Sequence, residues 1–226
     1  MEGFLSNITL KVNENIYIKD PDSSELGHKI VQGSISLIND IGFEQFNFKK
    51  LSKLITTTEA SIYRYFENKH KLLIYLTEWY WNWLDSKLVF SVANITDPRI
   101  KLEKAIKVLV SKVELDGNFS HINEVKLHNI IVAESIKVYF TKSVDKENQE
   151  GAFSSYKQLI LHLAELIVEA NSNYAYPNML ASSIVEGVYH QRFLAAHFPV
   201  LTHVRKEKDT VFEFYKSLVV KAIFDK

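Results

Sequence analysis

Cysteine is absent from this chain of 226 residues, and so are long hydrophobic runs. Without cysteine the chain has no disulfide scaffold, no cysteine-rich zinc site and no thiol nucleophile. No run reaches the roughly 18 uncharged apolar residues of a membrane-spanning helix, and the N-terminus lacks the basic start and apolar segment of a signal peptide. We therefore expect a soluble, cytoplasmic protein without a membrane partner.

Net charge is also missing, because 27 Lys and Arg balance 27 Asp and Glu. Any electrostatic specialisation must therefore be local. What the chain does have is apolar content: 46% of its residues are hydrophobic, which is enough to bury a full core.

Glycine and proline are scarce, at 7 and 4 residues, and apolar residues recur three and four positions apart over long windows. This periodicity predicts an all-α protein. The predicted helices run from caps at 22–24 to Gly42, from Asn47 to Ile55, from Thr58 to Phe66 and from Asn68 to Phe90, followed by longer ones near 98–115, 120–142, 148–171, 177–197 and 207–224.

The N-terminus is the exception to helical spacing. Ile8, Leu10 and Val12 alternate with polar residues, and the segment after Asn13 has turn chemistry. This pattern predicts a short β-hairpin or an extended arm over residues 1–22. Because an isolated hairpin is only marginally stable, we expect the arm to pack on the N-terminal unit of short helices in its own chain (residues 23–77) or on a partner subunit.

Two short helices joined by a tight turn, preceded by a helix that crosses both, have the geometry of a helix-turn-helix. The stretch from Gly42 to Lys69 resembles the DNA-binding signature of the TetR family of transcriptional regulators. Residues that match in type and spacing are Gly42, Phe43, Asn47, Tyr63, Phe66 and Lys69. The turn departs from the family pattern, because Ile55-Thr56-Thr57-Thr58 stands in place of the usual Ala-Gly-Val-Ser and Thr56 takes the position of the glycine.

The resemblance implies a helix-turn-helix DNA-binding domain (23–77) and a helical domain for effector binding and dimerisation (78–226). The arm (1–22) is an addition for which the family pattern gives no role. Lys49 and Lys50 at the start of the second helix are candidates for phosphate contact, although such lysines are commonly only a solvated face. Helix-capping residues leave amides free for phosphate, and Arg64 is suited to guanine. The candidate DNA-binding residues are Asn47, Lys49, Lys50, Thr57, Thr58, Glu59, Ser61, Tyr63, Arg64 and Lys69.

The effector site is less well marked. Trp79, Tyr80 and Trp83 share a helix face and could line a pocket mouth, or they could seal the junction between domains. The spacing of histidines along the sequence offers no metal-ligand pair, so we expect no metal and no cofactor.

The last two predicted helices are apolar around much of their circumference, which indicates more than one neighbour. Because the resemblance implies a two-fold dimer, they are assigned to its interface. The candidate interface residues are Ile184, Val188, Phe193, Phe212, Tyr215 and Val219.

These features predict a ligand-responsive repressor that binds a palindromic double-stranded DNA operator as a homodimer and is released by a small-molecule effector. One alternative is a helical adaptor of the same fold without sequence-specific DNA binding. The other is an all-helical enzyme, but no catalytic or cofactor motif supports it, so we expect no enzymatic activity.

Overall fold

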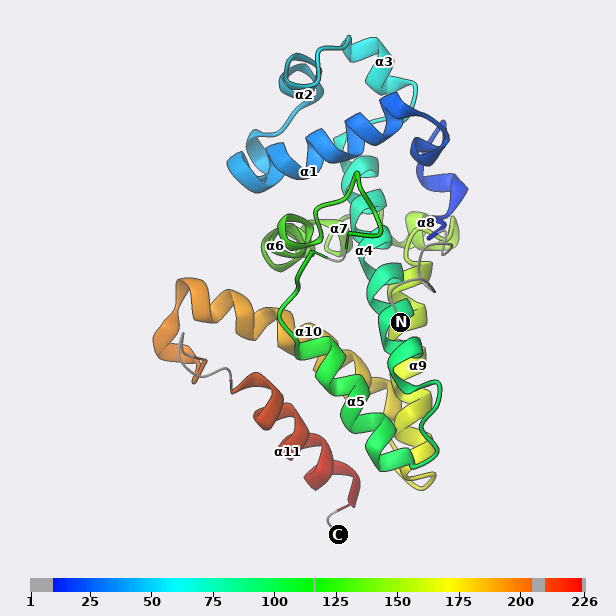
Figure 1. Cartoon of the computed structure of the whole chain (residues 1–226), viewed down its shortest axis with the longest axis vertical. Helices are drawn as coiled ribbons and strands as arrows, with labels where there is room; N and C mark the ends of the chain where they lie inside the picture. Colours follow the sequence, from blue (N-terminus) through cyan, green and yellow to red (C-terminus); the bar gives the residue numbers. More distant parts are fainter. Residues whose placement is uncertain (1–9, 116, 205–209, 225–226) are drawn as a thin grey trace. The chain divides into compact units, whose positions relative to one another are not determined.

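The computed structural model describes residues 10–115, 117–204 and 210–224, and within these ranges it is helical, without a β-strand (Figure 1). This confirms the predicted all-α class. No helix among these residues combines the length and apolarity that crossing a membrane would take.

The contacts between residues divide the chain into two compact units, and each unit takes segments that lie apart in the sequence. Unit 1 comprises residues 1–82 and 113–155, and unit 2 comprises residues 83–112 and 156–226. The functional division at residue 77 stays a prediction, because a compact unit is defined by packing and a functional domain by what it binds.

Unit 1 begins with two 3₁₀ turns and contains the helices of the candidate DNA-binding domain. Its elements are η1 (Glu14–Ile16), η2 (Pro21–Ser23), α1 (Glu25–Gln45), α2 (Phe48–Leu54), α3 (Glu59–Tyr63), the first part of α4 (Lys69–Val92), α6 (Glu124–Glu134), α7 (Ile136–Tyr139) and α8 (Val144–Gln149). Helix α1 packs against both α6 and α2.

Unit 2 is a bundle of longer helices around a hydrophobic core. Its elements are the end of α4, α5 (Pro98–Val110), most of α9 (Ser154–Ala170), α10 (Pro177–His197), η3 (Pro199–Leu201) and α11 (Val211–Phe224). Helix α5 contacts both α10 and α11.

Local capping explains where several helices begin. Ser24 accepts a hydrogen bond from the Gly27 amide at 3.2 Å and starts α1. Asp97 accepts from the amides of Arg99 and Ile100, and Pro98 follows it in the first turn of α5, where the missing amide hydrogen costs nothing. At the other end of α1, Gly42 leaves the helical conformation with a φ of 75°, as a helix stop requires.

Two long helices that were predicted from periodicity are each interrupted. The one near 120–142 is divided at Ser135 into α6 and α7, and the one near 148–171 is divided into α8 and α9. Gly151 lies at the second break with a φ of 82°, and a side chain there would overlap the Asn13 amide. The Ala152 amide donates to the Glu147 carbonyl at 2.9 Å across this glycine, so Gly151 ends α8 as a helix stop, and hydrophobic periodicity does not reveal it.

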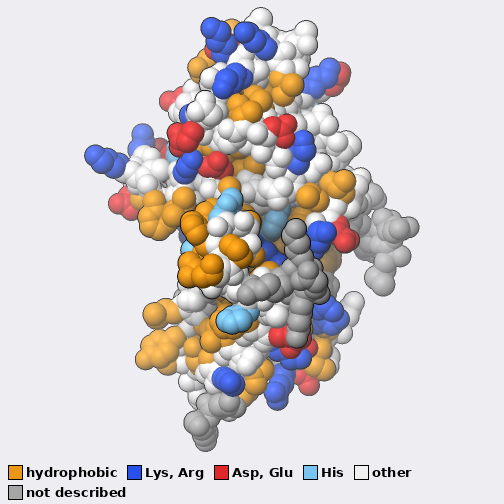
Figure 2. All heavy atoms as spheres, turned by 90° about the vertical axis from the view of Figure 1, so that its left-hand side faces the viewer, with side chains coloured by type: hydrophobic (Ala, Val, Ile, Leu, Met, Phe, Trp, Pro, Cys, Tyr) orange, Lys and Arg blue, Asp and Glu red, His pale blue; other side chains and the backbone are white. Residues whose placement is uncertain are grey.

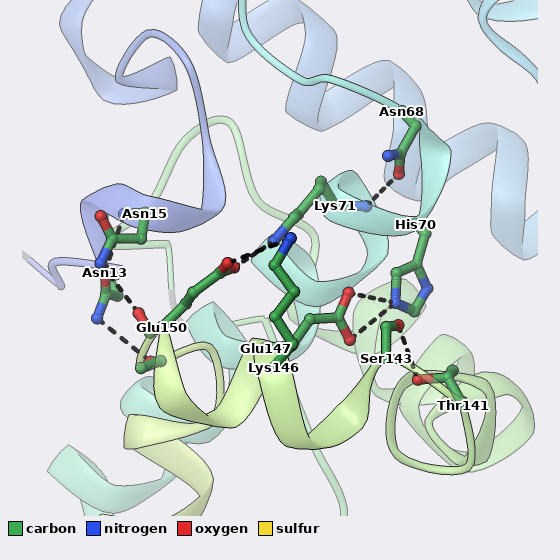
Figure 3. Close-up of polar contacts among 11 residues, drawn as sticks. Asn13, Asn15, Asn68, His70, Lys71, Thr141, Ser143, Lys146, Glu147 and Glu150 are labelled. Atoms are coloured by element: carbon green, nitrogen blue, oxygen red, sulfur yellow. Dashed lines mark hydrogen bonds and ion pairs between the residues drawn. The ribbon is translucent and has the colours of Figure 1, made fainter.

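The N-terminal arm forms no hairpin over the described residues 10–22, which corrects that alternative; Ile8 lies outside the described residues. Instead, the side chains of Leu10, Val12 and Ile16 are each buried, and hydrogen bonds from polar side chains attach the arm to the rest of unit 1. Asn15 donates to the Glu150 carbonyl at 3.0 Å, beside the α8 C-terminus (Figure 3). The Ile18 amide also donates to the Tyr65 carbonyl at 2.8 Å, so the arm packs on the predicted DNA-binding domain, which was one of the two alternatives, as well as on α8 outside that domain.

The same side of α8 is fastened to the start of α4 by ion pairs. Lys71 lies 3.4 Å from Glu150, and His70 lies 3.1 Å from the buried carboxylate of Glu147 (Figure 3). The arm, α4 and α8 therefore form one polar cluster in unit 1, next to the helix-turn-helix.

Candidate DNA-binding surface

The turn between α2 and α3 is a sharp corner. Asn47 caps α2 by accepting from the Lys50 amide at 2.9 Å, and Thr58 caps α3 by accepting from the Ser61 amide at 3.1 Å. Between the two helices Thr56 has a φ of 54°, a left-handed conformation in a β-branched residue. The chain therefore makes the turn that the sequence predicts. It does so although no glycine is present to relieve the backbone strain at Thr56.

Buried side chains hold the two short helices in place. Leu51 on α2, Ile62 on α3 and Phe66 after α3 have no exposed surface. On α1, a side chain at Gly33 would overlap the Ile55 methyl group, so α1 and α2 approach closely at this point. The aromatic ring of Phe48 meets that of Tyr63 edge-on, with centroids 5.0 Å apart. The packing fixes the angle between α2 and α3.

The opposite side of these helices faces solvent. Tyr63 is 49% exposed even though its ring packs on Phe48, so its hydroxyl can reach outward. The other exposed candidates are Asn47, Lys49, Lys50, Thr58, Glu59 and Arg64, while Thr57 and Ser61 are half-buried. Lys and Arg side chains gather over the end of unit 1 that carries α2 and α3 (Figure 2). Nine of the ten predicted residues thus lie on or beside one solvent-facing surface around the turn.

Two contacts within this surface limit how its members can act. The hydroxyls of Thr58 and Ser61 lie 2.9 Å apart and bond to each other. The Lys50 ammonium donates to the Gln45 carbonyl at 2.8 Å and keeps its other donors. Lys49 and Arg64 are exposed and carry no such contact among the described residues, so they are the better-placed cations.

Lys69 differs from the expectation for a phosphate-binding lysine. Its ammonium donates to the carbonyls of Phe43, Glu44 and Phe46 at 3.1, 3.3 and 3.2 Å, and it lies 4.7 Å from the centre of the Phe43 ring. An ammonium has three donors, and all three are used here. Lys69 therefore fastens the end of α1, and we remove it from the candidate DNA contacts.

The same corner of α1 is held from α6 and α7. Glu134 accepts from the Phe43 amide at 3.0 Å, and Lys137 pairs with both Glu134 and Glu44, at 2.8 and 2.9 Å. The hydrogen bond from Lys137 lowers the pKa of Glu44. Glu44 thus stays ionised and is held by Lys137, which it shares with Glu134.

Sequence reasoning missed one basic residue on this surface. Lys53 is exposed in the last turn of α2. Its position three and four residues after Lys50 and Lys49 places it on the same face of a helix, and that spacing was the available signal.

The aromatic candidates for an effector pocket lie in the core instead. Trp79 and Tyr80 in unit 1 and Trp83 in unit 2 are all buried. Trp79 packs edge-on against Phe119, and the Tyr80 hydroxyl lies 2.8 Å from Nδ1 of His128. Buried rings cannot form a pocket mouth, so this expectation is corrected. Residues 72–81 of α4 are all buried, which explains the aromatic content of this part of the helix.

The proposed interface residues on α10 and α11 are also mostly internal. Ile184, Val188, Tyr215 and Val219 are buried within unit 2, and only Phe193 and Phe212 are partly exposed. Tyr215 packs where a side chain at Gly187 would overlap its hydroxyl, and burial raises the pKa of Tyr215 to about 12. These four side chains belong to the core of one subunit and cannot form a surface for a second.

One segment of the chain matches a known protein family. Residues 30–76 match the family model of bacterial regulatory proteins, tetR family. This segment contains most of α1, both short helices and the start of α4. No curated protein sequence matches the chain.

Several solved structures share the fold. AibR, in complex with isovaleryl coenzyme A and operator DNA, is 17% identical over 87% of this chain and 96% of that chain, with a TM-score of 0.57. The fatty acid degradation regulator FadR from Bacillus halodurans is 14% identical over 86% and 93%, with a TM-score of 0.55. The superantigen PfiT is 15% identical over 92% and 100%, with a TM-score of 0.58. Identities this low show likeness of fold alone.

Proposed function

Because this chain belongs, through residues 30–76, to the TetR family of bacterial transcriptional regulators, we propose that it is a ligand-responsive repressor of a palindromic operator. The family assignment confirms the resemblance found in the sequence. Members of this family are DNA-binding regulators and not enzymes, so the enzyme alternative is set aside. The observation that carries the proposal is the sharp α2–α3 corner with exposed Lys49 and Arg64 around it.

We assign base contacts to α3 and its flanks. Arg64 can donate two hydrogen bonds to a guanine, Glu59 can accept from a cytosine, and Thr57 and Ser61 carry hydroxyls that suit either. Phosphate contacts fall to Lys49, Lys50 and Lys53, with the exposed α2 and α3 caps Asn47 and Thr58 and the outward hydroxyl of Tyr63. This division separates the residues that choose a sequence from those that set affinity.

The effector is proposed to be a small molecule bound in the helical region beyond the helix-turn-helix. AibR was crystallised with isovaleryl coenzyme A, and FadR is described as a regulator of fatty acid degradation. Short-chain acyl-coenzyme A thioesters are therefore the first compounds to test. Because binding energies are linked, operator DNA should weaken binding of a releasing effector by the same factor as the effector weakens DNA binding.

The homodimer is proposed to form through exposed apolar side chains of unit 2. Phe214 and Leu218 lie one turn apart on α11, 54% and 40% exposed. Phe198, Val200 and Leu201 around η3 are also exposed, and hydrophobic side chains gather on this part of the surface (Figure 2). Such a patch is typical of an interface. A dimer would present two α3 helices to half-sites about 34–36 Å apart.

The deciding experiment is a footprint and gel shift on the DNA flanking the gene that encodes this chain. We expect a palindromic protected site. Arg64→Ala should lose about 1–3 kcal/mol on that site and relax base choice at the guanine it contacts. Lys104→Ala, an exposed lysine on α5, is the matched control and should bind like the unchanged protein.

Equal affinity for all sequences, with or without Arg64, would contradict the proposal. That result would favour the adaptor alternative, a protein that has kept the fold without sequence-specific DNA binding. Selection of bound fragments from genomic DNA would distinguish the two without any assumption about the operator sequence.

A further inference from the structure

Three side chains from separate parts of unit 1 meet beside the N-terminal arm. Asp22 comes from η2, His28 from the first turns of α1, and His121 from the segment that precedes α6. The two imidazole rings are stacked, with centroids 4.0 Å apart and planes 10° apart. The spacing of histidines along the sequence gave no sign of this group, because its members are brought together only by the fold.

One distance within the group is close to that between ligands of one metal ion, and the others are within a small side-chain movement of it. Oδ1 of Asp22 lies 3.2 Å from Nε2 of His121 and 3.8 Å from Nε2 of His28. All three candidate ligand atoms lie within 4.8 Å of one another. In a tetrahedral zinc site with bonds of about 2.0–2.1 Å, neighbouring ligand atoms are about 3.3–3.4 Å apart.

Two of the atoms are buried and make no hydrogen bond. Oδ1 of Asp22 and Nε2 of His121 are both inaccessible to solvent, and their approach lacks the alignment of a hydrogen bond. Buried polar atoms are normally partnered, because leaving one unpaired costs about 1–3 kcal/mol. A cation between the carboxylate oxygen and the imidazole nitrogen would satisfy both.

We propose that Asp22, His28 and His121 bind a divalent first-row transition-metal ion such as Zn²⁺. Two imidazole nitrogens and one carboxylate form a ligand set that zinc and related ions use, whereas magnesium and calcium prefer oxygen ligands throughout. The set leaves a fourth position for water. Because each imidazole lone pair lies in the plane of its ring, the two stacked rings tilt apart when they share the ion.

The surroundings favour a positive charge. Asp20 accepts a hydrogen bond from the Asp22 amide at 2.9 Å, so a second carboxylate lies in the same turn. Burial, together with the charges of Asp22 and Asp20, raises the pKa of the nearby Tyr75 hydroxyl. These three residues also line a cavity of about 560 Å³ beside the arm, which offers a route for the ion and its water.

The ion would join segments that are distant in the sequence. It would tie the start of α1 to the segment before α6, in addition to the direct packing of α1 on α6. Since the ion binds the folded form, it should raise the melting temperature, and the rise should grow with the logarithm of the ratio of free ion to its dissociation constant.

The test uses the full chain after treatment with a chelator. Zn²⁺ is titrated by calorimetry, and Co²⁺ is added separately because its visible absorption reports coordination by nitrogen and oxygen. We expect one ion per chain and a raised melting temperature. His28→Gln and His121→Gln should each weaken binding at least about tenfold and abolish the thermal shift. His190→Gln, at an exposed histidine of α10, is the control and should bind like the unchanged chain.

Failure of the folded chain to bind Zn²⁺ and Co²⁺ would overturn the proposal, as would binding that persists in both variants. The histidines could instead serve only to pair with Asp22 when they are protonated. Each variant would then change stability by the same amount in zinc and in chelator, and that result would also overturn the proposal. Circular dichroism verifies that each variant folds. If His121→Gln does not fold, the result for His28→Gln is decisive, because the His28 side chain is 40% exposed and its replacement should disturb the fold less. The measurement contains no DNA, so it is independent of the proposed regulatory function.

Discussion

Thr56 is a point of backbone strain at the scale of single residues. A left-handed conformation costs a residue with a side chain roughly 1–2 kcal/mol, and glycine avoids this cost but loses about 0.5–1 kcal/mol of chain entropy. Thr56→Gly should therefore raise the free energy of unfolding by about 0.5–1 kcal/mol. Urea unfolding with an unchanged slope measures the difference. Thr57→Gly, next to it but without positive φ, should lower stability, and equal losses in both variants would contradict the explanation.

Asp85 is a second residue with a measurable consequence, in unit 2. Burial raises the pKa of Asp85 above its ordinary value of 3.8, and the hydrogen bond from His162 at 2.7 Å only partly opposes this. The folded protein therefore binds the proton more tightly than the unfolded chain does between 3.8 and the raised pKa. Within that window the contribution of Asp85 to stability falls as pH rises.

Replacing Asp85 by Asn removes this titration. Relative to Asp85→Asn, the unchanged protein should gain stability as pH falls through the raised pKa, measured by urea unfolding at a series of pH values. Asp145→Asn, at an exposed carboxylate of α8 in unit 1, provides the control. A difference between protein and Asp85 variant that stays constant with pH would show that burial does not govern this carboxyl group.

At the scale of elements, local signals predicted the helices of the site well. Asn47 and Thr58 cap helices as expected, and α10 runs from Pro177 to His197 as predicted. Helix caps and helix starts depend on a few neighbouring residues, so they can be predicted from the sequence. The breaks at Ser135 and Gly151 were not read from periodicity, because apolar spacing does not mark helix ends, although the glycine at the second break is itself a local helix-stop signal.

Helix α11 shows why faces are harder to predict than helices. Phe214 and Tyr215 are neighbours of similar size, yet Phe214 is exposed and Tyr215 is buried against Gly187. When both faces of a helix are apolar, hydrophobicity does not say which face turns inward. The burial of Trp79, Tyr80 and Trp83 was ambiguous for the same reason, because a large aromatic suits both a core and a pocket.

The outward face of α11 gives a prediction for assembly. Leu218→Glu places a charge on the proposed interface and should shift the chain from dimer to monomer in light scattering, with little loss of helix content. Lys221→Glu, one turn later and also exposed, is the matched control and should leave the dimer intact. A dimer that withstands Leu218→Glu together with Phe214→Glu would place the interface elsewhere.

At the scale of the whole molecule, a chain without net charge exposes a local group of basic side chains on α2 and beside α3, namely Lys49, Lys50, Lys53 and Arg64. Composition alone would not have indicated DNA binding, because a nucleic-acid-binding domain is commonly more basic. The resemblance in the sequence rested instead on the spacing of a few residues between Gly42 and Lys69, and the family model matches residues 30–76.

The occupied ammonium of Lys69 has a consequence for how this molecule would respond to ionic strength. A cation held by backbone carbonyls does not displace counterions condensed on a duplex, whereas each phosphate that is neutralised contributes about −0.9 to the slope of log affinity against log salt. Lys49→Ala should therefore flatten that slope, by about one unit for each protomer. Lys69→Ala should leave the slope unchanged and weaken the fold instead.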